Sequence, residues 1–217
     1  MKIVETIKNI WKIEDLRARL LTTLLFVLIY RFGSFIVLPG IDPTALGALK
    51  GQSAGGMMAL LDMFSGGALN RMSVFSMGIM PYINASIIMS LMQGAHVIPY
   101  LDRLAKEGEQ GRKKLTQITR YGTLILGAIQ SFGLTMAIMR MPTPSGMPIV
   151  LDPTMSWMVM TVFTLVTGTV LIMWLGEQVN EKGIGNGVSI ILFAGIVSRI
   201  PTMVTQLYGY FEMGGAY

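Results

Sequence analysis

The chain has 217 residues, of which 52% are hydrophobic and only 13% charged, and its formal net charge at pH 7 is +5. A soluble domain of this length cannot bury so much apolar surface, so the composition predicts embedding in a membrane. The chain has no cysteine and a single histidine, His96, which excludes a disulfide framework and a metal site built from thiolates or several imidazoles. We therefore expect a membrane protein without a metal or other cofactor.

Five segments are long and apolar enough to cross the hydrocarbon layer, which takes about 20 predominantly apolar residues per helix. The first segment is too long for the apolar part of a cleavable signal peptide, and no small-x-small site follows it, so we expect it to be retained. The sequence therefore predicts an all-α membrane protein with five transmembrane helices. The expected spans are 20–39, 77–98 (the inner part of the second span), 121–140, 155–176 and 184–207.

Most basic residues lie in two segments that flank the spans, 1–19 and 99–120. Because cytoplasmic loops of membrane proteins carry an excess of Lys and Arg, we expect both segments, and the turn 177–183, in the cytoplasm. The charge lies beside the membrane rather than on a globular face, which argues against specific nucleic-acid binding. The segments expected on the outer side are the loops 40–60 and 141–154 and the tail 208–217.

The segment 1–19 has apolar residues spaced for one face of a helix, at Ile3, Ile7, Ile10 and Trp11. Such spacing predicts an amphipathic segment that lies on the cytoplasmic membrane surface. The periodicity covers only a few turns, so a solvated basic leader is the alternative.

An odd number of spans leaves the two ends of the chain on opposite sides of the membrane. A second five-helix half fused behind this one would be inverted relative to it, which is the inverted-repeat plan of many transport proteins. No repeat is present within the 217 residues. We therefore expect this chain to be one half of a larger assembly, either as a part of a longer subunit or paired with a separate chain.

The second span is interrupted before its inner part. Gly78 and Pro81 lie within the apolar run, so the residues before and after them cannot form one straight helix. Irregular backbone at membrane depth is tolerated only where protein or water covers it. The segment 61–76, which contains a glycine pair, Asn70 and Arg71, is therefore expected to re-enter the protein from outside and to line an aqueous funnel.

An aliphatic stripe follows the interruption. Ile79, Ile83 and Ile87 are four residues apart and share a helix face, with Asn84 offset from them. Branched apolar side chains beside a cavity can form a constriction that sheds water and slows ions. The alternative is an ordinary helix-packing stripe.

Four long strings of the sequence carry a family resemblance. They are "RFGSFIVLPGID" (31–42), "MFSGGALNRMSVFSMGIMPYINASII" (63–88), "EGEQGRKKLTQITRYGTL" (107–124) and "LVTGTVLIMWLGEQVNEKGIGNGVSIILFAGIV" (165–197). Together they resemble the SecY family, the channel subunits of the Sec protein translocon. The family fold implied by this resemblance has ten helices in two inverted halves around an hourglass pore, which opens across the membrane and sideways to lipid. This chain matches the first half.

The resemblance implies roles for individual residues. The segment from Phe64 to about Phe75 resembles a short plug helix that closes the outward funnel, and Arg31 matches the family without an evident partner. Asn84 and Gln130 match polar positions near the lateral gate, with simple interhelical hydrogen bonding as the alternative role. Leu192 stands where the family has isoleucine. The implied sites are a plug (Phe64, Ser65, Gly66, Gly67, Ala68, Leu69, Asn70 and Arg71), a pore ring (Ile79, Ile83 and Leu192) and a lateral gate (Asn84, Ile87, Ile88 and Gln130).

The implied function is that of a pore-forming subunit in the bacterial cytoplasmic membrane, which conducts unfolded secretory proteins and releases membrane segments into lipid. The implied partners are the SecE and SecG subunits, the SecA motor or the ribosome, signal peptides and unfolded secretory proteins, the second half of the channel, and membrane lipid.

Two other functions can be weighed against a channel. An intramembrane enzyme is disfavoured because no carboxylate lies in the apolar body of a predicted span and His96 lies near a cytoplasmic end. The string "GIGNG" (183–187) lacks the Lys-Ser/Thr ending of a phosphate-binding loop and reads as a turn. Half of an inverted-repeat secondary transporter is the remaining alternative, although such proteins usually couple to ions through acids near the midplane.

Overall fold

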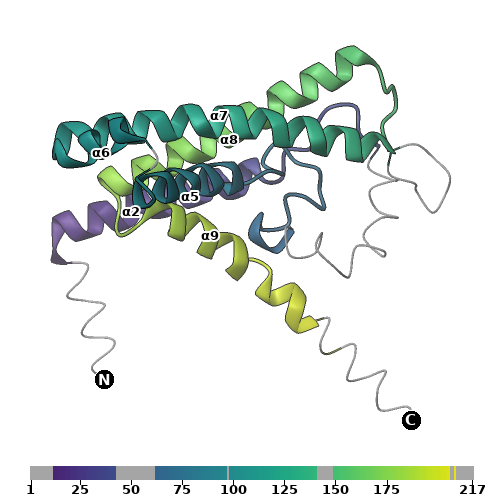
Figure 1. Ribbon diagram of the computed structural model, residues 1–217. Helices are drawn as coiled ribbons and strands as arrows, with labels where there is room; N and C mark the ends of the chain where they lie inside the picture. The colour runs from purple at the N-terminus through teal and green to yellow at the C-terminus, as the bar shows by residue number, and fades with distance from the viewer. Residues whose placement is uncertain (1–11, 43–61, 97, 141–148, 206–207, 209–217) are drawn as a thin grey trace, which may run out of the picture.

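The computed structural model describes residues 12–42, 62–96, 98–140, 149–205 and 208. Its regular elements are α-helices, and in these residues the only β-pairing consists of two isolated bridges, Val37 with Ser73 and Ile41 with Val150. The expectation of an all-α protein is confirmed. The helices are α2 (Glu14–Gly33), α5 (Met80–Gly94), α6 (Pro99–Lys106), α7 (Glu109–Arg140), α8 (Met155–Lys182) and α9 (Gly187–Val197), as shown in Figure 1.

Within the described residues, three helical stretches are long and apolar enough to cross a membrane. They are α7, α8 and the stretch Gly187–Thr205, which contains α9. The helix α2 carries Arg17, Arg19 and Arg31, and α5 has only 15 residues, so neither belongs to this group. By length and composition these three stretches fit the expected helical membrane protein, while the count of five spans stays a prediction.

Several helices run beyond the expected spans. α2 begins at Glu14, six residues before the expected span, α7 begins at Glu109 within the expected cytoplasmic loop, and α8 continues to Lys182. Apolar pattern marks only the part of a helix that faces lipid, whereas the helix itself continues through polar residues to a capping position such as Gly183. The expected loop 40–60, the tail 208–217 and residues 1–11 lie largely outside the described residues.

The fifth expected span is interrupted. α9 ends at Val197, residues 198–199 form a turn, and residues 200–205 are helical again. Asn186 begins α9 by accepting hydrogen bonds on its side-chain oxygen from the backbone N–H groups of Val188 (3.0 Å) and Ser189 (3.3 Å).

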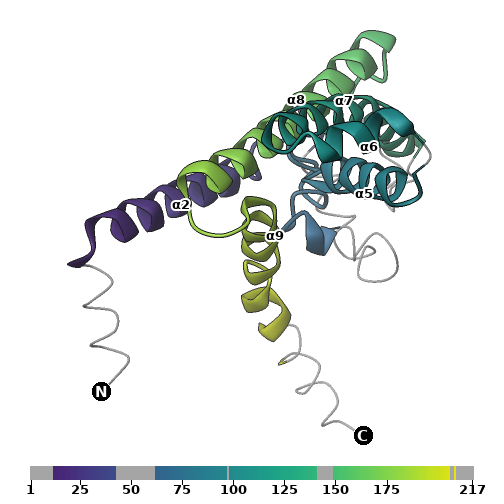
Figure 2. The same ribbon diagram turned by 60° about the vertical axis from the view of Figure 1, so that its left-hand side comes forward.

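α8 is the central element of the arrangement. It packs against α2, α5, α7 and α9, and α7 in turn packs against α5 and α6. Figure 2 shows α7 beside α5 and α6 on one side of α8, with α2 and α9 on the other. Residues 62–79 lie between these two groups, where the Val74 backbone oxygen would be only 2.3 Å from a Cβ on Gly168 of α8. The absence of a side chain at Gly168 therefore allows this segment to lie against α8.

Candidate functional site

Residues 62–79 form a compact series of turns, which we call the re-entrant segment. Only Asp62–Phe64 has helical geometry, so the short helix expected over Phe64 to Phe75 is replaced by turns. The physical reason is the backbone at Gly66, Gly67 and Met72, whose φ angles of 65°, 87° and 44° are incompatible with a right-handed helix. The segment is nevertheless well buried, because residues 65–69 have little exposed surface.

The re-entrant segment also pairs with the chain that follows α2. The backbone N–H of Leu38 donates to the Met72 oxygen at 2.9 Å, and the N–H of Val74 donates to the Ile36 oxygen at 2.9 Å. Irregular backbone at this position therefore has protein partners, as the sequence argument required. The break before α5 is present as expected, since Gly78 has a φ of 56° and α5 begins at Met80, with Pro81 in its first turn.

Two consecutive residues of α2 hold the segment through its backbone. The Tyr30 hydroxyl donates to the Ser65 oxygen at 3.3 Å, and Arg31 Nη1 donates to the Gly66 oxygen at 3.2 Å. The ring of Tyr30 also stacks on Phe75, with 6.0 Å between the ring centroids. Arg31, for which sequence reasoning found no partner, thus contacts the expected plug itself.

An ion pair with a buried carboxylate also holds the segment. The Asp62 carboxylate is fully buried and pairs with Arg199, in the turn that follows α9. Sequence reasoning singled out neither residue for a role in this site. The available signal was a lone acid beside the expected plug and a lone base in the fifth expected span, but nothing in the sequence places residues so far apart in contact.

Residues assigned to the pore ring lie around one apolar cluster, which we call the central cluster. Ile79 is 3% exposed within it, and Ile83 of α5 and Leu192 of α9 pack against it as half-buried side chains. Ala68 of the re-entrant segment is also a member. The structure therefore brings the three expected ring residues and the expected plug to the same place. The buried members are Tyr30, Ala68, Phe75, Ile79, Ile172, Leu175 and Ile191.

The residues assigned to the lateral gate lie on α5 and α7. Ile87 and Ile88 are 52% and 45% exposed, so α5 presents an apolar face that the described part of the chain leaves uncovered. Asn84 and Gln130 are half-buried, and within the described residues their side chains make no hydrogen bond.

The remaining expected plug residues differ in burial, because Phe64 is exposed whereas Asn70 and Arg71 are half-buried.

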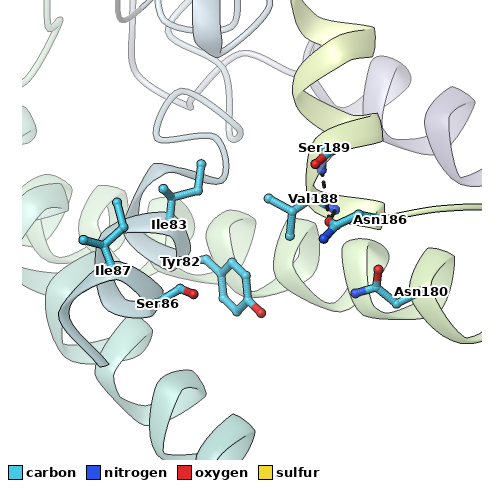
Figure 3. A pocket seen from close by; sticks show the side chains of 8 residues that line it. All are labelled: Tyr82, Ile83, Ser86, Ile87, Asn180, Asn186, Val188 and Ser189. Atoms are coloured by element: carbon cyan, nitrogen blue, oxygen red, sulfur yellow. Dashed lines mark hydrogen bonds between the residues drawn. The ribbon is translucent and has the colours of Figure 1, made fainter. Parts of the chain in front are cut away.

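A cavity of about 250 Å³ lies beside the central cluster, between α5 and the start of α9. Figure 3 shows the α5 side chains on one side of it and those from α8 and α9 on the other. Asn180 of α8, one of the lining residues, accepts a hydrogen bond from the Gly187 N–H at 2.7 Å. The cavity thus has an apolar wall and a polar wall, lined by Tyr82, Ile83, Ser86, Ile87, Asn180, Asn186, Val188 and Ser189.

Two solved structures share the fold of this chain. One, described as the structure of a protein conducting channel, matches with a TM-score of 0.60 at 16% sequence identity and covers 84% of this chain and 36% of that chain. Sec61 in a canine ribosome-channel complex from the endoplasmic reticulum matches with the same values. At this identity the likeness shows the fold alone, and this chain covers about a third of each matched chain.

Sequence comparisons define the family. The SecY family model matches residues 73–216. The protein translocase subunit SecY of Aquifex aeolicus is 45% identical over 211 residues, which are 97% of this chain and 49% of that protein. The subunit of the same name from Escherichia coli K12 is 48% identical over 192 residues, which are 88% of this chain and 42% of that protein. The chain belongs to the SecY family and spans about half the length of the curated relatives it matches, which confirms the resemblance seen in the sequence.

Proposed function

We propose that this chain is the N-terminal half of the pore-forming subunit of the Sec translocon. The subunit conducts unfolded secretory proteins across the membrane and releases membrane segments sideways into lipid. The observation that carries this proposal is 45% identity to a protein translocase subunit over 97% of the chain. The position of the re-entrant segment against the central cluster supports a channel that is closed by its own chain.

In the proposed channel, Ile79, Ile83 and Leu192 contribute half of an apolar collar. The other half comes from the second five-helix half, which approaches the exposed face of α5. Apolar side chains at a narrow point exclude water and so resist ion passage, while their flexibility lets them fit around a passing polypeptide. The re-entrant segment acts as the plug on the outer side of this collar.

The lateral gate follows from the same arrangement. Ile87 and Ile88 meet either the second half or the apolar part of a signal peptide, since both bury apolar surface against α5. Asn84 and Gln130 are half-buried without a partner in the described residues, and a polar group in a membrane is stabilised by a hydrogen bond across the interface. We assign them to contacts with the second half.

The proposed location is the bacterial cytoplasmic membrane, with residues 1–19 and 99–120 in the cytoplasm and the end of this chain outside, which corresponds to five spans in this half. The proposed partners are SecE, SecG, the second half of the subunit, and SecA or the ribosome as the source of the driving force. Signal peptides and unfolded secretory proteins are the substrates, and lipid receives the released segments.

A transporter half is disfavoured by the charge arrangement. An ion-coupled transporter needs an acidic group that is free to take up a cation near the midplane. The buried acid of the re-entrant segment, Asp62, is already neutralised by Arg199.

Deleting residues 64–70 from the full-length channel in lipid vesicles tests the proposal. A channel that loses its plug should pass ions and small solutes without saturation, and it should still export secretory proteins. Saturable uptake of a single solute, or no change in conductance and no export, would refute the proposed function.

A further inference from the structure

We propose that the ion pair between Asp62 and Arg199 is a latch that holds the plug in its closed position, and that this latch operates within the N-terminal half alone. The inference rests on the proposed role of the re-entrant segment as a plug. Arg199 belongs neither to the proposed pore ring nor to the proposed lateral gate. Its role here is to position the plug so that the channel stays closed.

The acidic side of the latch fixes the shape of the segment. One oxygen of the Asp62 carboxylate accepts the backbone N–H of Asn70 at 2.8 Å, and the other accepts the Asn70 side-chain amide at 2.6 Å. The Asp62 backbone oxygen accepts the N–H of Gly67 at 2.9 Å. Asp62 therefore connects the two ends of the turns 62–70. Because of these hydrogen bonds, an interaction that fixes Asp62 also fixes the turns as a unit.

The basic side of the latch lies on α9 and in the turn after it. Arg199 is four residues after Gly195, in the turn that follows α9. A Cβ on Gly66 would lie 2.9 Å from the Gly195 Cα, and a Cβ on Gly195 would lie 3.3 Å from the Phe64 oxygen. The segment thus approaches the α9 backbone closely at Gly195, and Arg199 pairs with its carboxylate one turn further on.

Because Asp62 is buried when the plug is closed, the ion pair stabilises the closed state. The Asp62 side chain is fully buried, whereas the Arg199 side chain is 25% exposed. A buried carboxylate that loses its cation is strongly unfavourable. Once the plug is displaced from its closed position, water hydrates the carboxylate and the loss of Arg199 matters little. Removing Arg199 should therefore destabilise the closed state selectively and shift the population toward the displaced plug.

Ion leak through the full-length assembled channel in lipid vesicles tests the latch, with the amounts of assembled complex matched. Arg199→Gln should raise the resting leak by roughly tenfold or more, because it leaves the carboxylate buried and unpaired. Arg199→Lys, which keeps the charge, should leak much less. Asp62→Asn combined with Arg199→Gln should leak less than Arg199→Gln alone, since no buried charge remains.

The double variant separates a latch from general damage. If Asp62→Asn and Arg199→Gln have independent structural effects, the double variant leaks at least as much as Arg199→Gln, and the latch is refuted. Arg120→Gln is the matched control, because it breaks an ion pair between α7 and α8, Arg120 with Glu177 at 2.7 Å, which does not involve the segment. It should leave the resting leak unchanged, and an equal leak from Arg120→Gln would also refute the latch.

The same assay distinguishes failure of the latch from failure of the proposed function. If the 64–70 deletion leaks and Arg199→Gln does not, the assignment of the segment as a plug is supported and the latch is refuted. Absence of leak from the deletion, together with absence of export by the unmodified channel, would refute the proposed function itself.

Discussion

The Arg31 guanidinium donates a hydrogen bond from Nη1 to the Gly66 backbone oxygen at 3.2 Å, and so joins α2 to the first turn of the re-entrant segment. The same cation lies 5.8 Å from the centre of the Phe35 ring. A charged residue in a predicted span thus has a defined partner on the segment that we propose as the plug.

Arg31→Gln should weaken this attachment. A hydrogen bond from a charged donor contributes about 1.5–3 kcal/mol, so its loss should raise the resting ion leak several-fold or more while export continues. Arg17→Gln, at the exposed start of α2, is the control and should leave the leak unchanged. Equal leak from the two variants at matched protein amounts would show that Arg31 does not act on the plug.

Gly195→Val should displace the segment from α9. Its Cβ would lie 3.3 Å from the Phe64 oxygen and 3.5 Å from the Tyr30 hydroxyl, and the second methyl group of valine needs more room than either neighbour leaves. We expect an increased leak and greater accessibility of a cysteine placed at Asn70. Gly133→Val in α7, where nothing lies within 4 Å, controls for the helix propensity of valine. Unchanged labelling of Asn70→Cys in the Gly195→Val background would contradict the proposed contact.

Ile83→Asn should weaken the apolar collar. A hydrogen-bonding group beside the central cluster eases hydration, and a loss of about 1.4 kcal/mol from the closed state raises the open population roughly tenfold. We expect increased ion leak and acceptance of weak signal sequences, whereas Ile83→Leu should do neither. Ile125→Asn, on the exposed face of α7, reports general destabilisation. Similar leak from both asparagine variants would make Ile83 a simple packing residue.

The orientation of the chain is open to a direct labelling experiment. Because the chain has no cysteine, single cysteines can be introduced at the exposed positions Lys113, at the start of α7, and Asp152, before α8. A membrane-impermeant thiol reagent should reach Lys113→Cys only from the cytoplasm and Asp152→Cys only from outside. Labelling of Asp152→Cys from the cytoplasm would invert the proposed topology.

Local sequence was sufficient for the main features of the fold. Apolar length located α7, α8 and the stretch containing α9, and Gly78 with Pro81 indicated the break before α5, because glycine and proline act on the backbone where they stand. The turns of residues 65–79 were not predicted. Their geometry depends on positive φ angles at Gly66 and Gly67 and on tertiary hydrogen bonds, and an apolar helical pattern carries no information about either.

The contacts that hold the segment were missed for a different reason. Arg31 binds a backbone oxygen, which leaves no trace in side-chain patterns, and Asp62 meets a residue 137 positions later in the chain. The grouping of Ile79, Ile83 and Leu192 around the central cluster was implied by the family resemblance rather than by periodicity. A stripe of isoleucines alone fits a packed core equally well.

In the proposed channel, a secretory polypeptide passes beside Ile83. The most direct measurement is photocrosslinking in the full-length assembled channel, with a photoreactive residue at Ile83 or, as the control, at Ile125, while a secretory protein is stalled during export. We expect strong crosslinks from position 83 that require the stalled substrate, and none from position 125. Crosslinks from position 125 with none from position 83 would contradict the proposed path of the polypeptide.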